Sequence, residues 1–473
     1  MNIVSTIRCA LTVLIILGLA ACGGSGGGGS GGSTAAPSLQ SVVFTSGVGS
    51  QTDLFLIKED GTGMVTLANS TDRDSFAGVT ASGRVLFYRF VGGTQADLYS
   101  VNADGTGLVA LANSTDDESF AGVTPSGRVI FGRWVGGAQV NLYSINADGT
   151  GLVALATSTD SEFFSGVTPS GRVIFQRRVG GTQNDLYSIN ADGTGLVALA
   201  TSTDSESLAG VTPSGRVIFQ RWVGGTQSNL YSINADGTGL VALAISTDNE
   251  YFSGVTPSGR VIFQRVVGTQ SDLYSINADG TGQVALATST DSEYFAGVTP
   301  SGRVIFQRWV GGTQNDLYSI NADGTGLVAL SISTDDDSYA GVTPSGRVIF
   351  IRAVGGTYDL YSINADGTGQ VALATSTDNE SLAGITPSGR VIFDRFSGGI
   401  QNDLYSINAD GTGLVALATS TDNESLAGVT ASGRVIFRRR VGTQDDLYSI
   451  NADGTGLAVL ANTTSDESFA HIF

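Results

Sequence analysis

The chain has 473 residues, of which 43 are acidic and 24 are basic, so its formal net charge is -19. This balance disfavours nucleic-acid binding, which usually requires a basic face, and it disfavours adsorption to an anionic lipid surface. The single histidine, His471, leaves the body of the chain without the base that Ser-His-Asp or Cys-His catalysis needs, and it excludes histidine-rich metal sites. We therefore expect no metal and no cofactor, and we predict that the chain is not an enzyme.

Residues 1–22 are typical of an export signal. Arg8 supplies a positive charge, and the apolar run of residues 11–19 is too short to span a bilayer comfortably. The run ends in Leu19-Ala20-Ala21-Cys22, which resembles a bacterial lipobox and implies lipidation of Cys22. An ordinary signal peptide with a chance cysteine is the alternative.

The segment 23–39 follows as a predicted tether, because its first eleven residues are almost purely Gly and Ser and cannot bury apolar surface. In bacterial lipoproteins, a residue other than aspartate after the cysteine implies sorting to the outer membrane, and here that residue is Gly23. The expected location is the cell envelope, with the body anchored by lipid at the outer membrane and facing the periplasm or the cell surface.

Residues 40–473 consist of ten repeats of about 44 residues. Each repeat carries a version of the phrase Asp-Leu-Tyr-Ser-Ile-Asn-Ala-Asp-Gly, and a period of this length indicates a solenoid, a propeller or an array. The leucine of the phrase recurs at steps of 43 or 44 residues, at Leu54, Leu98, Leu142, Leu186, Leu230, Leu273, Leu317, Leu360, Leu404 and Leu447.

One repeat contains the signals of four short strands and shows no helical periodicity. Pro169-Ser170-Gly171 predicts a turn, and Asp192-Gly193 is a strong hairpin marker. An acidic loop, residues 202–206, leads to the next repeat. The predicted strands are residues 164–168, 172–177, 185–189 and 196–200, which together have the size of one propeller blade.

These motifs resemble the WD40-like propeller repeats of TolB-type periplasmic proteins. The resemblance rests on the Pro-Ser-Gly-Arg turn, the Val-Ile-Phe strand and the Asp-Leu-Tyr-Ser phrase, and it covers roughly residues 40–473. It implies an all-β propeller of four-stranded blades, in which residues 164–168 form the innermost strand and residues 196–200 the outermost. The α/β domain of TolB has no counterpart here, which puts a TolB-like partnership in doubt.

The two ends of the repeat array are out of phase. The array opens at Ser41–Phe44 with a second-strand element and ends at Ser468–Phe473 with an inner-strand element. The last strand can therefore complete the first blade, which removes the open edges of a linear array. We predict one ten-bladed ring closed by its terminal strands; two five-bladed rings and an open array are the alternatives.

Charged residues recur on what should be one rim of the ring. An arginine ends the second strand in nine of the repeats, and the acidic loop precedes the inner strand, so the two should be neighbours in an antiparallel pair. A structural ring of ion pairs, a ligand- or cation-binding ring, and glycosidase-like carboxylates are the three interpretations. The predicted rim ion pairs involve Arg133, Arg177, Arg221 and Arg308 with Asp116, Asp160, Asp204 and Asp291.

The position after each of these arginines varies while its surroundings barely change. All three tryptophans of the chain lie at this position, and exposed aromatic residues often mark contact surfaces. Blade-to-blade packing is the alternative. The predicted ligand-contact residues are Phe90, Trp134, Arg178, Trp222, Trp309, Phe396 and Arg440.

Together these features predict a lipid-anchored, extracytoplasmic propeller that acts as a protein- or glycan-binding or scaffolding module. The alternatives are a polysaccharide-active enzyme that uses rim carboxylates and a structural surface protein without a specific ligand. We expect a monomer that touches the membrane only through its lipid and that does not bind nucleic acid.

Overall fold

The structure, a computed structural model, describes residues 40–48, 51–398 and 401–473. The chain divides into two units, residues 1–38 and 39–473, and every described residue belongs to the second. The predicted signal peptide, the predicted lipidation site Cys22 and the predicted tether lie outside the described residues. Among the described residues, no helix has the length and apolarity needed to cross a membrane.

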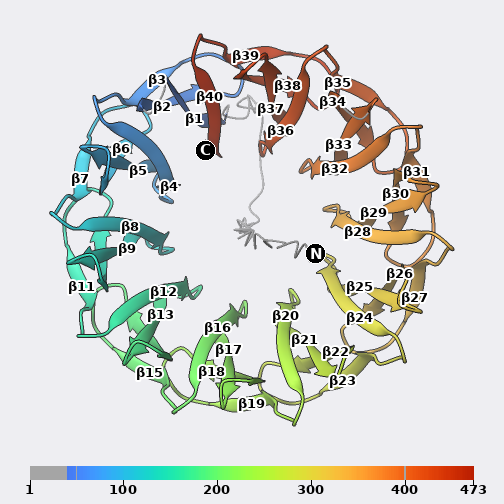
Figure 1. Ribbon diagram of the computed structural model, residues 1–473, viewed down its shortest axis with the longest axis horizontal. Helices are drawn as coiled ribbons and strands as arrows, with labels where there is room; N and C mark the ends of the chain where they lie inside the picture. Colours follow the sequence, from blue (N-terminus) through green and yellow to red (C-terminus); the bar gives the residue numbers. More distant parts are fainter. Residues whose placement is uncertain (1–39, 49–50, 399–400) are drawn as a thin grey trace, which may run out of the picture. The chain divides into compact units, whose positions relative to one another are not determined.

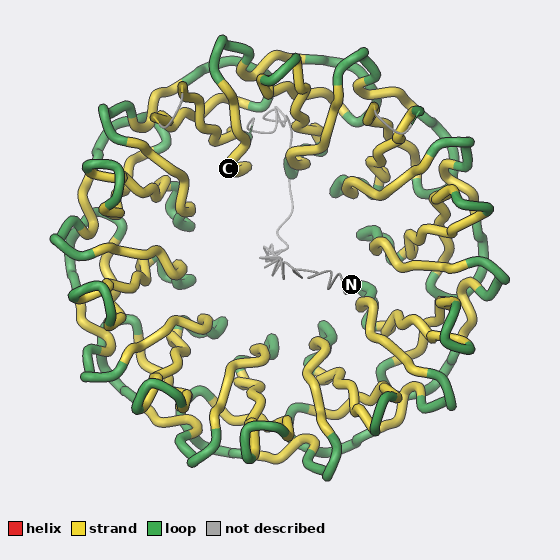
Figure 2. Tube along the Cα trace, viewed as in Figure 1, coloured by secondary structure: helices red, strands yellow, loops and turns green. Residues whose placement is uncertain are grey.

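The second unit is a ten-bladed β-propeller. Its strands form ten four-stranded antiparallel sheets arranged around one axis (Figure 1), and only strands and loops occur in the described residues (Figure 2). The fold predicted from the repeats is therefore confirmed.

The inner strands line the centre of the ring. Their Gly residues leave room for a side chain of the next blade: a Cβ on Gly78 would lie only 2.9 Å from the ring of Phe120. The last two residues of the segment predicted as an acidic loop, Ser205 and Glu206, belong to the inner strand, so these strands begin earlier than predicted. They are β4 (Arg73–Val79), β8 (Asp117–Val123), β12 (Ser161–Val167), β16 (Ser205–Val211), β20 (Asn249–Val255), β24 (Ser292–Val298), β28 (Asp336–Val342), β32 (Asn379–Ile385), β36 (Asn423–Val429) and β40 (Asp466–Ile472).

The second strands carry the core of each blade. β-branched and aromatic residues favour strands, and Val173, Ile174 and Phe175 are fully buried. These strands are β1 (Ser41–Val48), β5 (Arg84–Val91), β9 (Arg128–Val135), β13 (Arg172–Val179), β17 (Arg216–Val223), β21 (Arg260–Val267), β25 (Arg303–Val310), β29 (Arg347–Val354), β33 (Arg390–Ser397) and β37 (Arg434–Val441).

The third strands join each blade to its neighbour. The Ser188 hydroxyl donates a hydrogen bond of 2.5 Å to the Ala235 carbonyl of the next blade, and Tyr187 stacks on Phe175 at 5.5 Å. These strands are β2 (Gln51–Lys58), β6 (Gln95–Asn102), β10 (Gln139–Asn146), β14 (Gln183–Asn190), β18 (Gln227–Asn234), β22 (Gln270–Asn277), β26 (Gln314–Asn321), β30 (Thr357–Asn364), β34 (Gln401–Asn408) and β38 (Gln444–Asn451).

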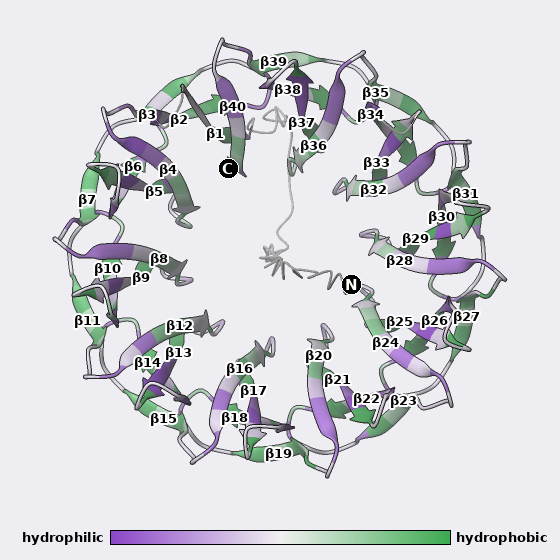
Figure 3. Cartoon of the chain, in the orientation of Figure 1, coloured by the Kyte–Doolittle hydropathy of each residue, from purple (hydrophilic) through white to green (hydrophobic). Residues whose placement is uncertain are grey.

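The outermost strands are short and apolar, and the sequence Val-Ala-Leu-Ala dominates them (Figure 3). Their leucines and final alanines pack against the neighbouring blade, as Leu199 and Ala200 do against Phe219. These strands are β3 (Val65–Ala68), β7 (Val109–Ala112), β11 (Val153–Ala156), β15 (Val197–Ala200), β19 (Val241–Ala244), β23 (Val284–Ala287), β27 (Val328–Ser331), β31 (Val371–Ala374), β35 (Val415–Ala418) and β39 (Ala458–Ala461).

The closing blade contains both ends of the array, as the phase of the repeats predicts. Its strand order is β3-β2-β1-β40, and Phe44 in β1 lies opposite Phe469 in β40. The backbones of Ser41 and Phe473 exchange two hydrogen bonds of 3.2 and 2.7 Å. This pairing removes the two open sheet edges and excludes both two smaller rings and an open array.

The direction of the strands gives the ring two different faces. One face carries the ends of the second strands, the hairpins that follow them and the beginnings of the inner strands, for example residues 178–183 and 201–205; we call it the variable face. The opposite face carries the nearly identical Pro-Ser-Gly and Asn-Ala-Asp-Gly turns. The predicted ion pairs and contact residues all belong to the variable face.

Candidate functional site on the variable face

A buried carboxylate in the inner strand holds the arginine near the end of the second strand in nine blades. Glu162 lies directly opposite Arg177 in the β12–β13 pair, and Arg177 Nε donates to Glu162 Oε1 at 3.2 Å. The carboxylates are fully buried, whereas the arginine side chains are 16–23% exposed. The nine pairs, with distances of 2.7–3.2 Å, are Arg89–Asp74, Arg133–Glu118, Arg177–Glu162, Arg221–Glu206, Arg265–Glu250, Arg308–Glu293, Arg352–Asp337, Arg395–Glu380 and Arg439–Glu424.

A tyrosine of the third strand also contacts each of these guanidinium groups. Arg177 Cζ lies 4.6 Å from the centroid of the Tyr187 ring, and the corresponding distances in the other eight blades are 4.6–5.0 Å. A guanidinium group fixed between a carboxylate and an aromatic ring is positioned by two favourable contacts. This geometry supports the structural interpretation of the ion-pair ring.

The predicted aspartate partners of these arginines make a different contact, and this part of the prediction is corrected. Asp160 precedes the inner strand and faces the neighbouring hairpin, so its Oδ1 accepts a hydrogen bond from the Gly180 amide at 3.2 Å. Glu162, two residues after Asp160, lies in β12 and is the residue opposite Arg177. The same capping contact joins Asp116 to Gly136, Asp204 to Gly224 and Asp291 to Gly311 at 2.9–3.1 Å.

The inner-strand glutamates make their hydrogen bonds through one oxygen, and the second oxygen, such as Glu118 Oε2, is buried without a hydrogen-bond partner among the described residues. Burial raises the pKa of Glu118, although hydrogen bonds from Ser114 and Arg133 favour its ionised form. The Ser114 hydroxyl donates to Glu118 Oε1 at 2.5 Å. Within the described ranges, no group of three or more His, Cys, Asp or Glu residues is arranged to hold a metal ion.

The predicted contact residues differ in their exposure and in the side chains that they contact. Trp134, Trp309 and Phe396 are 40%, 36% and 41% exposed, although they are large and apolar. Three others contact a neighbouring side chain. The ring centroids of Trp222 and Tyr251 lie 6.3 Å apart. Arg178 Cζ lies 5.1 Å from the Phe163 ring centroid, and Arg73 Cζ lies 4.0 Å from the Phe90 ring centroid. Arg440 is exposed and lies 3.9 Å from Asp445.

Two further positions of the variable face were missed by the sequence analysis. The first is directly across the hairpin from the variable position, where Tyr358 lies opposite Ala353. The second is in the inner strand, where Phe163, Tyr251 and Tyr294 replace the serine of most blades. The first position varies as strongly as the predicted one and the second varies in three blades, so comparison of the repeats at every position would have found them.

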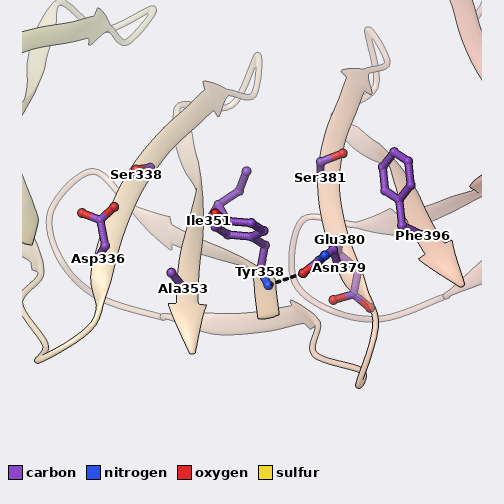
Figure 4. A pocket seen from close by; sticks show the side chains of 9 residues that line it. All are labelled: Asp336, Ser338, Ile351, Ala353, Tyr358, Asn379, Glu380, Ser381 and Phe396. Atoms are coloured by element: carbon purple, nitrogen blue, oxygen red, sulfur yellow. Dashed lines mark hydrogen bonds between the residues drawn. The ribbon is translucent and has the colours of Figure 1, made fainter. Parts of the chain in front are cut away.

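Two notches open between adjacent blades on this face. The larger, with a volume of about 480 Å³, lies between the β28–β31 and β32–β35 blades (Figure 4). We call it the Tyr358 notch; it is lined by Asp336, Ser338, Ile351, Ala353, Tyr358, Asn379, Glu380, Ser381 and Phe396. The smaller, of about 320 Å³, is the Trp134 notch, lined by Tyr88, Phe90, Thr94, Ala96, Asp117, Glu118, Ser119 and Trp134.

The notches bring together some of the predicted contact residues and separate others. Phe396 lines the Tyr358 notch, and Phe90 and Trp134 both line the Trp134 notch. Arg178, Trp222, Trp309 and Arg440 line neither of the two. The predicted residues thus surround the ring in several places and do not converge on one site.

Comparisons with known proteins find similarity only among solved structures. No protein-family model matches the chain, and no curated protein matches it. Among solved structures, dipeptidyl peptidase 4 from Porphyromonas gingivalis is 11% identical, covering 83% of this chain and 60% of that one, with a TM-score of 0.48. A puromycin-hydrolyzing peptidase from Mycobacterium tuberculosis is 12% identical over 63% and 53% of the two chains, with a TM-score of 0.36.

A putative TolB from Agrobacterium tumefaciens is 14% identical over 56% of this chain and 83% of that one, with a TM-score of 0.29. The chain spans only 53% and 60% of the length of the two peptidases. At these identities the likeness concerns the propeller fold alone, so the peptidase activities belong to those proteins.

The prediction that the chain is not an enzyme is corrected by these comparisons. Several of the similar structures are peptidases or hydrolases. A propeller of this kind therefore gives no ground for excluding an enzyme, and the shortage of histidine in the repeats was too narrow a basis for the prediction.

Proposed function

We propose that the protein is a lipid-anchored binding module of the cell envelope that holds a protein or glycan partner on the variable face of its propeller. Cys22 would carry the lipid, and residues 23–39 would hold the ring away from the outer membrane. Membrane contact would be made through the lipid alone.

One observation carries this proposal: side-chain variation and exposed aromatic surface coincide on one face. Trp134, Trp309 and Phe396 are at least 36% exposed, and both notches open beside residues of this kind. Packing alone does not require large aromatic side chains at solvent-exposed positions, whereas contact surfaces are enriched in them. The arginine pairs that recur in nine blades provide a rigid support for them, which reduces the entropy lost on binding.

The proposal is tested with the full chain in detergent, applied to a glycan array and used to isolate partners from envelope extracts. Replacing the exposed aromatic residues Trp134, Trp309 and Phe396 together by alanine should abolish the binding found and leave the melting temperature unchanged. Binding that survives the triple substitution would contradict the assignment to this face.

The same preparation is assayed for cleavage of any glycan or peptide that it binds. Turnover that is lost when one inner-strand carboxylate is replaced, without loss of binding, would identify an enzyme that uses the rim carboxylates. Binding without turnover agrees with the module proposed here.

A further inference from the structure

We propose that the Tyr358 notch binds one or two pyranose rings of a neutral glycan. This inference rests on the proposed function, because it names the ligand class of one part of the variable face. The ring of Tyr358 and the ring of Phe396, which come from adjacent blades, would offer apolar faces to the C–H groups of the sugar.

The notch exists because the aromatic residue of this blade lies on the third strand and not on the second. Other blades carry a large residue at the end of the second strand, such as Trp134, Trp222 or Trp309, opposite a smaller one. In the β28–β31 blade the small Ala353 occupies that position, and Tyr358 stands opposite it in β30. The exchange empties the space near β29 and places an aromatic ring, 53% exposed, at the side of the space.

The inner strands keep the notch open. In other blades Phe163, Tyr251 or Tyr294 projects from the inner strand at the position that Ser338 and Ser381 occupy here. Trp222 and Tyr251 show the alternative, since their rings lie 6.3 Å apart. Small residues at both inner-strand positions therefore distinguish this interface from those that an aromatic side chain fills.

The polar groups of the notch suit sugar hydroxyls. Within the described part of the chain, the Ser338 and Ser381 hydroxyls make no hydrogen bond, although both line the cavity. Asp336 Oδ1 accepts from the Asn315 amide at 2.8 Å, which leaves its second oxygen to accept from a ligand. Asn379 Oδ1 accepts from the Tyr358 amide at 3.0 Å and so fixes the backbone that carries the ring (Figure 4).

Charge and shape decide against other ligand classes. Asp336 lines the notch without an arginine partner in the ranges that the structure describes, and the chain has a net charge of -19, so an anionic ligand is disfavoured. Protein anchor residues prefer enclosed, fully desolvated pockets, whereas Tyr358 and Phe396 remain 53% and 41% exposed. A volume of about 480 Å³ with aromatic walls and a few accessible hydroxyls is suited to a small number of sugar rings.

The experiment measures the binding of neutral oligosaccharides to the full chain in detergent, by glycan array and then by calorimetry. The key variant is Ala353→Trp, which fills the notch with the residue that three other blades carry at that position. Val266→Trp makes the same change at the equivalent position in β21, away from the notch, and is its matched control. Tyr358→Ala removes one aromatic wall.

We expect Ala353→Trp to abolish glycan binding and Tyr358→Ala to weaken it at least about tenfold, as for other central aromatic contacts. Val266→Trp should bind like the parent chain, and all three variants should keep the parent melting temperature. Equal weakening by Ala353→Trp and Val266→Trp would overturn the assignment to this notch.

The remaining outcomes separate this inference from the proposed function. Glycan binding that survives Ala353→Trp overturns the notch and leaves binding elsewhere on the variable face intact. Binding of a protein partner with no affinity for any neutral glycan overturns the sugar assignment alone. Failure to bind either a glycan or a protein contradicts the proposed function and this inference with it.

Discussion

The nine repeated blades and the closing blade have the same backbone but are stabilised by different side-chain contacts. In the nine blades an arginine joins the inner-strand carboxylate to a tyrosine ring. In the closing blade the corresponding residues are Ser46 and Phe55, and only the carboxylate of Glu467 remains. Glu467 is 1% exposed and accepts a 3.3 Å hydrogen bond from the Ser46 hydroxyl.

The contacts between blades differ in the same way. Ser100 and its equivalents donate to a carbonyl of the next blade, whereas the closing blade has the buried Leu56 at this position. A cluster that includes Val43, Leu54, Leu56 and Phe87 fills the interface with the β4–β7 blade. A blade can therefore form without the arginine pair, on apolar packing, backbone pairing and the hydrogen bond from Ser46 to Glu467.

The largest effect should come from removing β40, because the closing blade has no other inner strand. Ending the chain after residue 465 exposes the edge of β1 and deletes the apolar contacts of Phe469 and Ile472. We expect the free energy of unfolding to fall by more than about 4 kcal/mol, from the lost burial of two large side chains and the lost strand pairing. Urea titration followed by tryptophan fluorescence measures it. A chain shortened by eight residues within 23–39 is the control, and equal stability of the two would contradict closure by β40.

The next largest loss of stability should come from breaking an arginine pair in one of the nine blades. Arg221→Met removes the partner of Glu206, which is fully buried, and should destabilise the fold by about 3–5 kcal/mol because an uncompensated buried charge remains. Glu467→Gln neutralises the corresponding carboxylate in the closing blade, which has no arginine partner among the residues described, and should be neutral or stabilising. Chemical denaturation of both variants compares them, and equal losses would show that the two kinds of blade do not differ.

A smaller gain should follow from giving the closing blade the missing pair. Ser46→Arg combined with Phe55→Tyr places a guanidinium group opposite Glu467 and over a tyrosine ring. We expect a stabilisation of about 1 kcal/mol, as for hydrogen bonds to charged groups and cation–π contacts of partly exposed residues. Thermal unfolding detects it. Adding Glu467→Gln to this variant should cancel the gain, and a gain that persists would have another cause.

The smallest effect concerns pH and belongs to the closing blade alone. His471 replaces the inner-strand glycine of the other blades and stacks on Phe76 at 5.3 Å. Burial lowers the pKa of its imidazole below the ordinary 6.5, so the unfolded chain takes up a proton first. Its contribution to stability is complete above about pH 6.5 and is lost as the pH falls toward the folded-state pKa. The difference in melting temperature between the parent and His471→Gly, measured from pH 7.5 to 5, should change in this direction.

The repeats made the fold predictable because their period, turns and phase all agree. Ser41–Phe44 and Ser468–Phe473 are visibly two parts of one blade, so closure could be predicted before any coordinates were known. The start of the inner strand could not be predicted in this way. Asp160 and Glu162 are both acidic, and only the strand register places Glu162 opposite Arg177.

The candidate site was predictable only in part. The variable position was visible because its neighbours do not change, and it led to Phe396, Phe90 and Trp134. Tyr358 was missed because its significance depends on the residue across the hairpin. That hairpin has two residues, Gly355 and Gly356, where most blades have three, and the shift conceals which residue faces Ala353.

The exchange of hydrogen bonds between Ser41 and Phe473 has a consequence for biogenesis. A polypeptide that emerges N-terminus first, from the ribosome or a translocon, remains an open arc until β40 has been made. The first three strands must wait for more than 400 residues of synthesis before their sheet is complete. Chaperone protection should therefore be needed longest at the segment that is made earliest.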